Sequence, residues 1–166
     1  MKETSKAVPL PDGVDDHGRF QRRFWIVQRC AWVVFAVVLI ACLLGLLGRG
    51  GPFSRSVVQT AQGSLDLPAI SRWNAPDELK VTLSASDQDR TVILDPPFLE
   101  AFSVEGIDPP QKQTFARDGH IGYVFAADAT AETTVIFRLQ TQRPGLRSYA
   151  IGIGNDASER STFIFP

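Results

Sequence analysis

The chain has 166 residues, and its 17 lysines and arginines against 18 aspartates and glutamates give a formal net charge of −1. This balance excludes a strongly basic nucleic-acid binder, because no overall field attracts a polyanion. Apolar residues make up 44% of the chain, and they concentrate in residues 30–47, which contain no charged side chain. That concentration predicts a membrane segment.

The first 29 residues divide into two parts. Residues 1–18 contain Pro and Asp without apolar periodicity, which predicts a disordered cytoplasmic tail. In residues 19–29 apolar side chains recur at helical spacing (Phe20, Phe24 and Val27) among arginines. This pattern predicts an amphipathic juxtamembrane helix.

Residues 30–48 are predicted to form a single transmembrane helix. The eighteen uncharged residues 30–47, at about 1.5 Å each, give about 27 Å, close to the thickness of a bilayer core, and Gly48 extends the helix by one residue. Glycine and proline follow in residues 48–52, so a hinge is expected over 49–55.

The cationic flanks predict the orientation of this helix. Residues 12–29 carry four arginines and residues 49–66 carry two, which favours a cytoplasmic N-terminus and an extracytoplasmic C-terminal domain. The predicted location is therefore the inner, cytoplasmic membrane. Two alternatives stay open, namely a cleaved signal peptide and a lipoprotein lipidated at Cys42, which ends the lipobox-like run Leu39–Cys42.

One face of the predicted helix carries the small residues Ala41, Gly45 and Gly48 at i, i+4 and i+7. Small residues allow close approach of a second helix, so this face is a candidate for helix packing, including packing against a second copy. The two cysteines, Cys30 and Cys42, are too far apart on one helix to form a disulfide within the chain.

Residues 56–166 change from a helical period to a period of two, which is typical of strands. The fold class expected is mostly β, an immunoglobulin-like β-sandwich that follows a single transmembrane α-helix. Turn signals such as Asp95-Pro96-Pro97 and Asp118-Gly119 separate the runs. The expected strands lie at 56–60, 65–70, 79–83, 90–94, 102–104, 121–125, 135–139, 148–153 and 161–165.

The last run, Ser161–Phe165, ends in alternating aromatic residues. We expect Phe163 and Phe165 to fill the core as the final strand; the alternative is a docking peptide that adds to the sheet edge of a partner.

The exported domain contains no recognisable catalytic, cofactor or metal site. His120 follows the Asp118-Gly119 turn signal and is expected to flank a hairpin, and no Gly-x-Ser-x-Gly motif accompanies it. Asp87-Gln88-Asp89 lacks the glycine and distal glutamate of a calcium loop and is expected to be a solvated hairpin tip.

Arg72 and Trp73 are the candidate contacts for a partner. Arginine and tryptophan are enriched at the centres of protein interfaces, and here they precede the turn at Asn74-Ala75-Pro76. The alternative is that Trp73 packs into the sandwich while Arg72 lies at the surface.

Several short motifs, namely residues 25–29, 43–48, 51–54, 63–65, 71–76 and 163–166, together resemble an uncharacterised bacterial family of small single-pass membrane proteins. The resemblance implies one span, a β-rich exported C-terminal domain and an accessory role beside another membrane protein. At Leu67-Pro68-Ala69 the chain departs from the family pattern of an aromatic residue and a cation.

We therefore expect a membrane-anchored, non-enzymatic interaction module that binds another membrane or envelope protein through its β-sandwich and also through its helix. The expected partners are the lipid bilayer and that protein, with no nucleic acid. Two alternatives are an envelope hydrolase or transferase with an unrecognised carboxylate site and a ligand-binding lipoprotein-like domain.

Overall fold

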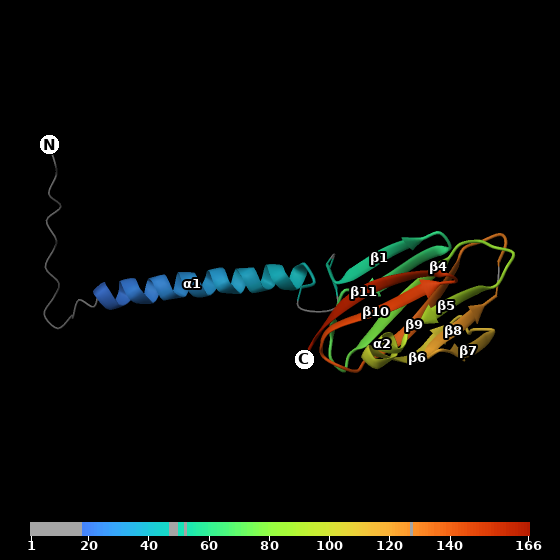
Figure 1. Cartoon of the computed structure of the whole chain (residues 1–166). Coiled ribbons are helices and arrows are strands. Elements are labelled where there is room, and N and C mark those ends of the chain that lie inside the picture. Colours follow the sequence, from blue (N-terminus) through green and yellow to red (C-terminus); the bar gives the residue numbers. More distant parts are fainter. Residues whose placement is uncertain (1–17, 47–49, 52, 127) are drawn as a thin grey trace, which may run out of the picture. The chain divides into compact units, whose positions relative to one another are not determined.

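The computed structural model describes residues 18–46, 50–51, 53–126 and 128–166 of the chain (Figure 1). The chain forms two compact units, Met1–Leu39 and Ile40–Pro166. The tail predicted over residues 1–18 lies outside the described residues except for Gly18, which begins the first helix.

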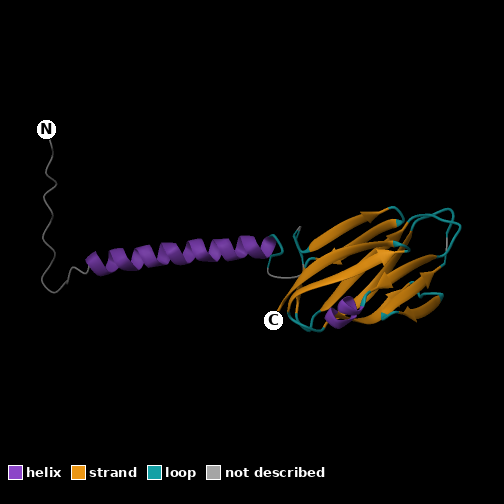
Figure 2. Ribbon diagram, in the orientation of Figure 1, coloured by secondary structure: helices purple, strands orange, loops and turns teal. Residues whose placement is uncertain are grey.

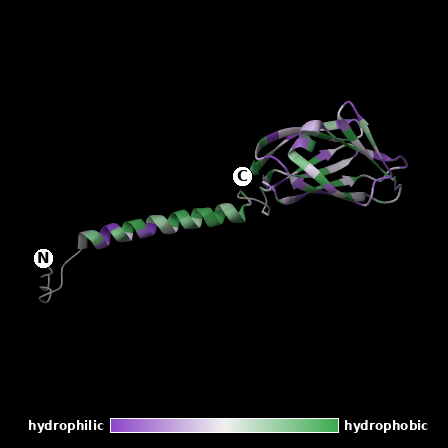
Figure 3. Ribbon diagram, turned by 90° about the horizontal axis from the view of Figure 1, so that it is seen from below, coloured by the Kyte–Doolittle hydropathy of each residue, from purple (hydrophilic) through white to green (hydrophobic). Residues whose placement is uncertain are grey.

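Helix α1, Gly18–Leu43, is one continuous helix of 26 residues, about 39 Å long at 1.5 Å per residue. An 18-residue window within its segment Phe20–Leu43 has a mean hydropathy of 2.3, so the helix is long and apolar enough to cross a membrane. Polar residues concentrate in its first half, and the second half is almost uniformly apolar (Figure 3). Near the polar part, the Arg29 guanidinium lies 3.6 Å from the centroid of the Trp25 ring.

The helix ends at Leu43, five residues before the predicted end at Gly48. Gly45 has a φ of +79°, and the Leu46 and Gly45 N–H groups donate to the carbonyls of Ala41 and Cys42, both at 3.0 Å. These bonds form a Schellman motif, which stops a helix whatever the hydropathy of the residues that follow. Residues 47–49, with Gly48 among them, lie outside the described part.

The C-terminal unit contains a β-sandwich of two sheets (Figure 2). The five-stranded sheet has the order β1-β2-β4-β9-β6 and the six-stranded sheet the order β3-β11-β10-β5-β8-β7. All pairs are antiparallel except β3 with β11. The strands are β1 Arg55–Thr60, β2 Gly63–Pro68, β3 Ile70–Arg72, β4 Pro76–Leu83, β5 Arg90–Leu94, β6 Phe102–Asp108, β7 Gln113–Arg117, β8 His120–Phe125, β9 Thr133–Thr141, β10 Gly145–Ile153 and β11 Asp156–Phe165.

The core lies between the two sheets, where the inward residues of each strand meet. Phe137 of β9 packs edge to face against Tyr123 and Phe125 of β8, with ring centroids 5.5 and 6.0 Å apart. Phe102 of β6 meets Tyr149 of β10 in the same way at 5.8 Å. Since each pair joins one sheet to the other, aromatic rings bridge the sandwich at two places.

The predicted β-sandwich is confirmed, with three differences in detail. The run expected as one strand over 65–70 is divided at Ala69 between β2 and β3, which belong to different sheets. Strand β7 was not predicted, because its five residues are all exposed and show no alternation of buried and exposed positions. Asp95-Pro96-Pro97, expected as a turn, begins the short helix α2, Pro96–Ala101, because Asp95 caps it and proline is tolerated in a first turn. After β5, the chain forms β6 in the five-stranded sheet and only then returns to the six-stranded sheet, where β8 lies beside β5 and β7 lies at the edge. Because this order of strands differs from that of an immunoglobulin domain, the immunoglobulin-like subtype stays a prediction.

The final strand forms where expected, but its inward side is the opposite of the predicted one. Ile164 and Thr162 are fully buried, whereas Phe163 is 41% exposed. Phe165 shares the outward side with Phe163, and their ring centroids lie 4.8 Å apart. The expectation that Phe163 and Phe165 fill the core is therefore wrong, because a shift of one residue exchanges the two faces of a strand.

Candidate functional site

Arg72 and Trp73, the predicted partner contacts, lie at the surface at the end of β3. Arg72 is exposed and Trp73 is 51% exposed. The Trp73 backbone N–H donates to the Phe165 carbonyl at 2.6 Å, and its indole Nε1 donates to the Gln142 carbonyl at 3.1 Å. Trp73 therefore does not pack into the sandwich; one hydrogen bond holds its backbone and another holds its ring at the surface.

Two apolar side chains that the sequence analysis did not single out lie beside this pair. Leu146 of β10 is 67% exposed and is the cross-strand partner of Phe163. Facing residues of paired strands point to the same side of a sheet, so Leu146 and Phe163 form one apolar surface. In β10 and β11, outward and buried residues alternate along the strand. This alternation would have predicted the surface if the inward side of each strand had been assigned correctly.

Further apolar residues lie on the outward face of the six-stranded sheet, beyond the polar pair Ser148 and Ser161. Ile93 pairs with Gly152 on one side and with Gly122 on the other, and Gly122 pairs with Phe115 of the edge strand. A Cβ atom at Gly122 would lie 2.2 Å from the Phe115 ring, so this ring covers the glycine. We name this surface the apolar face; the polar residues Ser148, Glu159 and Ser161 share it, and its apolar outward residues are Ile70, Ile93, Phe115, Val124, Leu146, Ala150, Phe163 and Phe165.

The outward face of the five-stranded sheet has the opposite character, and we name it the charged face. Asp66 of β2 is the cross-strand partner of Lys80 in β4, and Glu78 of β4 is the partner of Arg138 in β9. Opposite charges that face each other across strands stabilise a solvated sheet surface. The charged face is therefore more polar than the apolar face.

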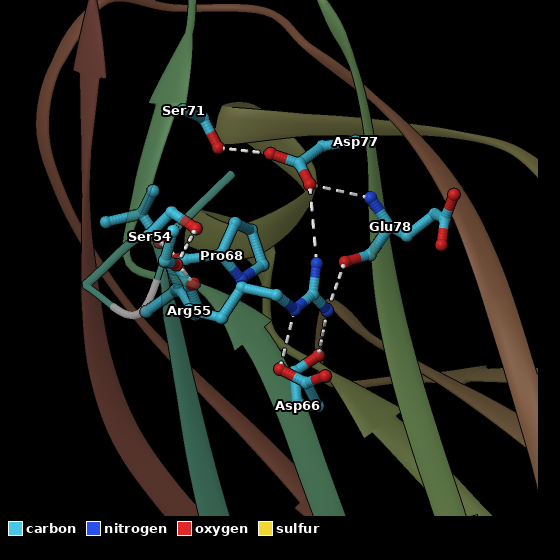
Figure 4. Close-up of polar contacts among 10 residues, drawn as sticks. Ser54, Arg55, Asp66, Pro68, Ser71, Asp77 and Glu78 are labelled. Atoms are coloured by element: carbon cyan, nitrogen blue, oxygen red, sulfur yellow. Dashed lines mark hydrogen bonds and ion pairs between the residues drawn. The ribbon is translucent and has the colours of Figure 1, made fainter. Parts of the chain in front are cut away.

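An open polar pocket of about 370 Å³ lies where the chain enters the sandwich (Figure 4). The Arg55 guanidinium fills much of its floor: its Nε donates to Asp66 Oδ1 at 2.7 Å, and its Nη2 donates to the Asp66 and Glu78 carbonyls at 3.0 and 3.1 Å. Its Nη1 lies 3.9 Å from Oδ1 of Asp77, which is buried. These bonds tie β1 to β2 and β4, so the arginine secures the first strand.

The buried carboxylates of the sandwich are bonded internally. Asp77 accepts hydrogen bonds from the Ser71 hydroxyl and from the Glu78 N–H. Asp95 accepts from the Phe98 N–H at 2.8 Å and from the Ala150 N–H at 2.6 Å. Each group therefore joins elements of the fold, and the alternative of an enzyme with a carboxylate site stays a prediction.

His120 begins β8 directly after the turn at Asp118 and Gly119, whose φ values are +53° and +80°. Its Nδ1 lies 3.1 Å from the Asp118 carbonyl, and the side chain is exposed. Further along the chain, the Thr130 hydroxyl bonded to Asp128 holds the pKa of that carboxyl below its ordinary value. Both arrangements belong to local turns.

Asp87-Gln88-Asp89 is exposed, as expected, but it is not a hairpin tip. It lies in the loop that carries the chain from β4 in one sheet to β5 in the other. Asp89 is ion-paired with Lys112 at 2.7 Å. In the part of the chain that the structure describes, no group of three His, Cys, Asp or Glu side chains is placed to hold a metal ion.

The predicted helix-packing face does not form within the described residues. Ala41 lies in the last turn of α1, whereas Gly45 lies beyond the helix with a positive φ and Gly48 is outside the described part. A Cβ atom at Gly45 would lie 2.1 Å from the Gly50 carbonyl oxygen. Gly45 therefore serves the turn that ends the helix. Cys30 and Cys42 are both free and exposed on α1.

Tyr149 carries a pH dependence that can be measured. Burial raises the pKa of its phenol to about 12, and its hydroxyl lies 2.6 Å from that of Thr162. An unfolded tyrosine titrates near pH 10, so the unfolded chain loses its proton first. The stabilisation by neutral Tyr149 should be complete below about pH 10 and disappear as the pH rises to about 12, a loss of about 2 to 3 kcal/mol.

Urea unfolding of the full chain in detergent micelles, followed at several pH values between about 9 and 11.5, checks this expectation. The matched variant is Tyr149→Phe, which cannot ionise and should show a flatter dependence on pH. Equal slopes for the two proteins would contradict the assignment to Tyr149.

No family model and no curated protein matches this chain. The structure itself defines the class of protein: in the described residues, a β-sandwich follows a helix that is long and apolar enough to span a membrane.

Proposed function

We propose that this protein is a membrane-anchored, non-enzymatic interaction module that binds another membrane or envelope protein through its β-sandwich. The length and hydropathy of α1 support an anchor in the inner membrane. The four arginines in residues 12–29, against two in residues 49–66, support a cytoplasmic N-terminus and an extracytoplasmic sandwich.

The observation that carries the proposal is the contrast between the apolar face and the charged face. A sheet surface exposed to water normally carries polar side chains, as the charged face does. The apolar face instead presents Phe115, Leu146 and Phe163, each between 39% and 67% exposed. Exposed large apolar side chains on a sheet face are typical of protein contact sites, and the exposed Arg72 on β3 fits the polar rim of such a site.

Photo-cross-linking in native membranes tests this function. A photoreactive amino acid placed at Phe115 or Val124 should form an adduct of one mass with an integral membrane protein. The matched control places the same residue at Thr82 or Arg138 on the charged face, where no such adduct should form. Adducts that are equally abundant from both faces, or absent from both, would refute the apolar face as the partner surface.

A separate expectation concerns topology. Protease added to intact spheroplasts should digest residues 51–166 and spare residues 1–29, because the arginines favour the cytoplasmic side. A tag at each end of the chain, detected on immunoblots with and without detergent, provides the measurement. Protection of the C-terminal tag before detergent is added would reverse the orientation, and a protein released with a new N-terminus at residue 42 or beyond would indicate cleavage.

A further inference from the structure

One end of the sandwich is built around the point where the chain enters it, and we name it the tether end. The Ser54 carbonyl there accepts the N–H groups of Ala69 and Ile70 at 2.8 and 3.2 Å. The Ala69 carbonyl accepts the Phe163 N–H at 3.0 Å. With the bonds that join Trp73 to β11 and to the loop after β9, these contacts bring four segments of the chain together at this end.

Exposed apolar side chains are concentrated at the tether end. Among the described residues after residue 52, six large apolar side chains are exposed. Four of them lie at or beside this end, and the other two, Val57 and Phe115, lie on the outer strands β1 and β7. The four are Phe53, Trp73, Leu146 and Phe163.

The cations at this end are also accessible. Arg72 is exposed, and its guanidinium makes no ion pair with any residue in the described ranges. Arg143, in the loop after β9, has a 59% exposed side chain paired with Glu100 at the surface. An exposed arginine beside aromatic side chains is the combination that favours the headgroup region of a bilayer.

The covalent connection keeps this end close to the last turn of α1. Eleven residues, 44–54, separate the end of α1 from the start of β1. The Phe53 N–H donates to the Leu44 carbonyl at 3.2 Å, so Phe53 lies next to the residue that follows the helix. If α1 spans a bilayer, Phe53 must lie near the surface of that bilayer.

We propose that the tether end rests on the lipid surface of the bilayer that α1 spans. The Trp73 indole and the Phe53 ring lie at the depth of the lipid headgroups, and Arg72 binds the phosphates of anionic phospholipids. The tether makes this contact intramolecular, so a weak intrinsic affinity for lipid is enough. The contact leaves the part of the apolar face around Ile93, Phe115 and Val124 free for a neighbouring membrane protein. This inference rests on the membrane anchor of the proposed function.

The three tryptophans of the chain provide the test, because Trp73 is the only one outside α1. Full-length protein carrying Trp25→Phe and Trp32→Phe is reconstituted into phosphatidylcholine vesicles that contain phosphatidylglycerol. The Trp73 emission should shift to the blue relative to detergent micelles and be quenched by lipids brominated near the headgroup. Arg72→Gln should lower the ratio of docked to undocked protein about five-fold, which corresponds to about 1 kcal/mol per basic residue at an anionic surface.

Two controls separate the failure of this inference from the failure of the anchor. A protein that keeps only Trp32 reports on α1: quenching of Trp32 without quenching of Trp73 would refute lipid docking and leave the anchor intact. Quenching of neither indole would refute the anchor itself. Arg138→Gln on the charged face should leave the Trp73 signal unchanged; an equal effect of Arg72→Gln and Arg138→Gln would refute the specific role of Arg72.

Discussion

Replacing Ile164 by alanine should destabilise the sandwich by about 2 to 5 kcal/mol, the cost of removing a buried aliphatic side chain from a packed core. Ile164 is fully buried, and β11 lies between β3 and β10 in the six-stranded sheet. Because a domain of this size has a total stability of about 5 to 15 kcal/mol, the loss should be evident as a large drop in the urea midpoint.

The matched control for Ile164→Ala is Phe163→Ala at the adjacent position. It removes more atoms, but its ring is 41% exposed, so the cost should stay near 1 kcal/mol. Urea unfolding of the two variants in detergent micelles, followed by Trp73 fluorescence, provides the comparison. A larger loss for Phe163→Ala than for Ile164→Ala would reverse the inward side that the structure assigns to β11.

The final strand shows why the sequence predicted the element and not its inward side. Residues 161–165 read as a strand because β-branched and aromatic residues dominate them. Hydrophobicity alone assigns both phenylalanines to the core, although the partner strand determines which side faces inward. Tyr149 of β10 reaches Thr162 and needs its hydroxyl, so the small polar residue is buried and the large aromatic residues are not.

The end of α1 shows a second limit of the sequence signal. Leu43, Leu44, Leu46 and Leu47 continue the apolar run, and hydropathy therefore extends the helix beyond Leu43. Gly45 is a C-cap signal, but a glycine inside an apolar run is equally common in membrane helices, where it favours packing. The two interpretations separate only when the φ of Gly45 is known.

The candidate site was predicted in part. Arg72 and Trp73 were selected by residue type, and both lie at the surface. The apolar face around them was missed because its members come from six strands, and only the register of the sheet shows that Ile93, Phe115 and Leu146 share one side. Single-strand periodicity carries no information about which strands are neighbours.

Helix α2 was missed because six residues are too short for a helical period to be visible. Helix α2 follows β5 directly and packs against β10. Its capping residue Asp95 accepts a hydrogen bond from the Ala150 N–H of β10. Phe98 of α2 then enters the core and meets Phe102 at 5.0 Å and Tyr149 at 5.1 Å. Three aromatic rings from α2, β6 and β10 thus form one cluster that joins both sheets.

Replacing Phe98 by alanine should therefore cost about 3 to 5 kcal/mol, since the cavity lies against the rings of Phe102 and Tyr149, which belong to different sheets and cannot both move inward. Phe115→Ala is the matched control: it removes the same atoms from a ring that is 39% exposed on the edge strand, so it should cost far less. Urea unfolding and the near-ultraviolet circular dichroism of the tyrosines provide the measurement in both variants. If Phe98→Ala unfolds at the wild-type urea midpoint, α2 lies outside the cooperative core; if it lowers the midpoint strongly while Phe115→Ala does not, this short helix is an integral part of the sandwich.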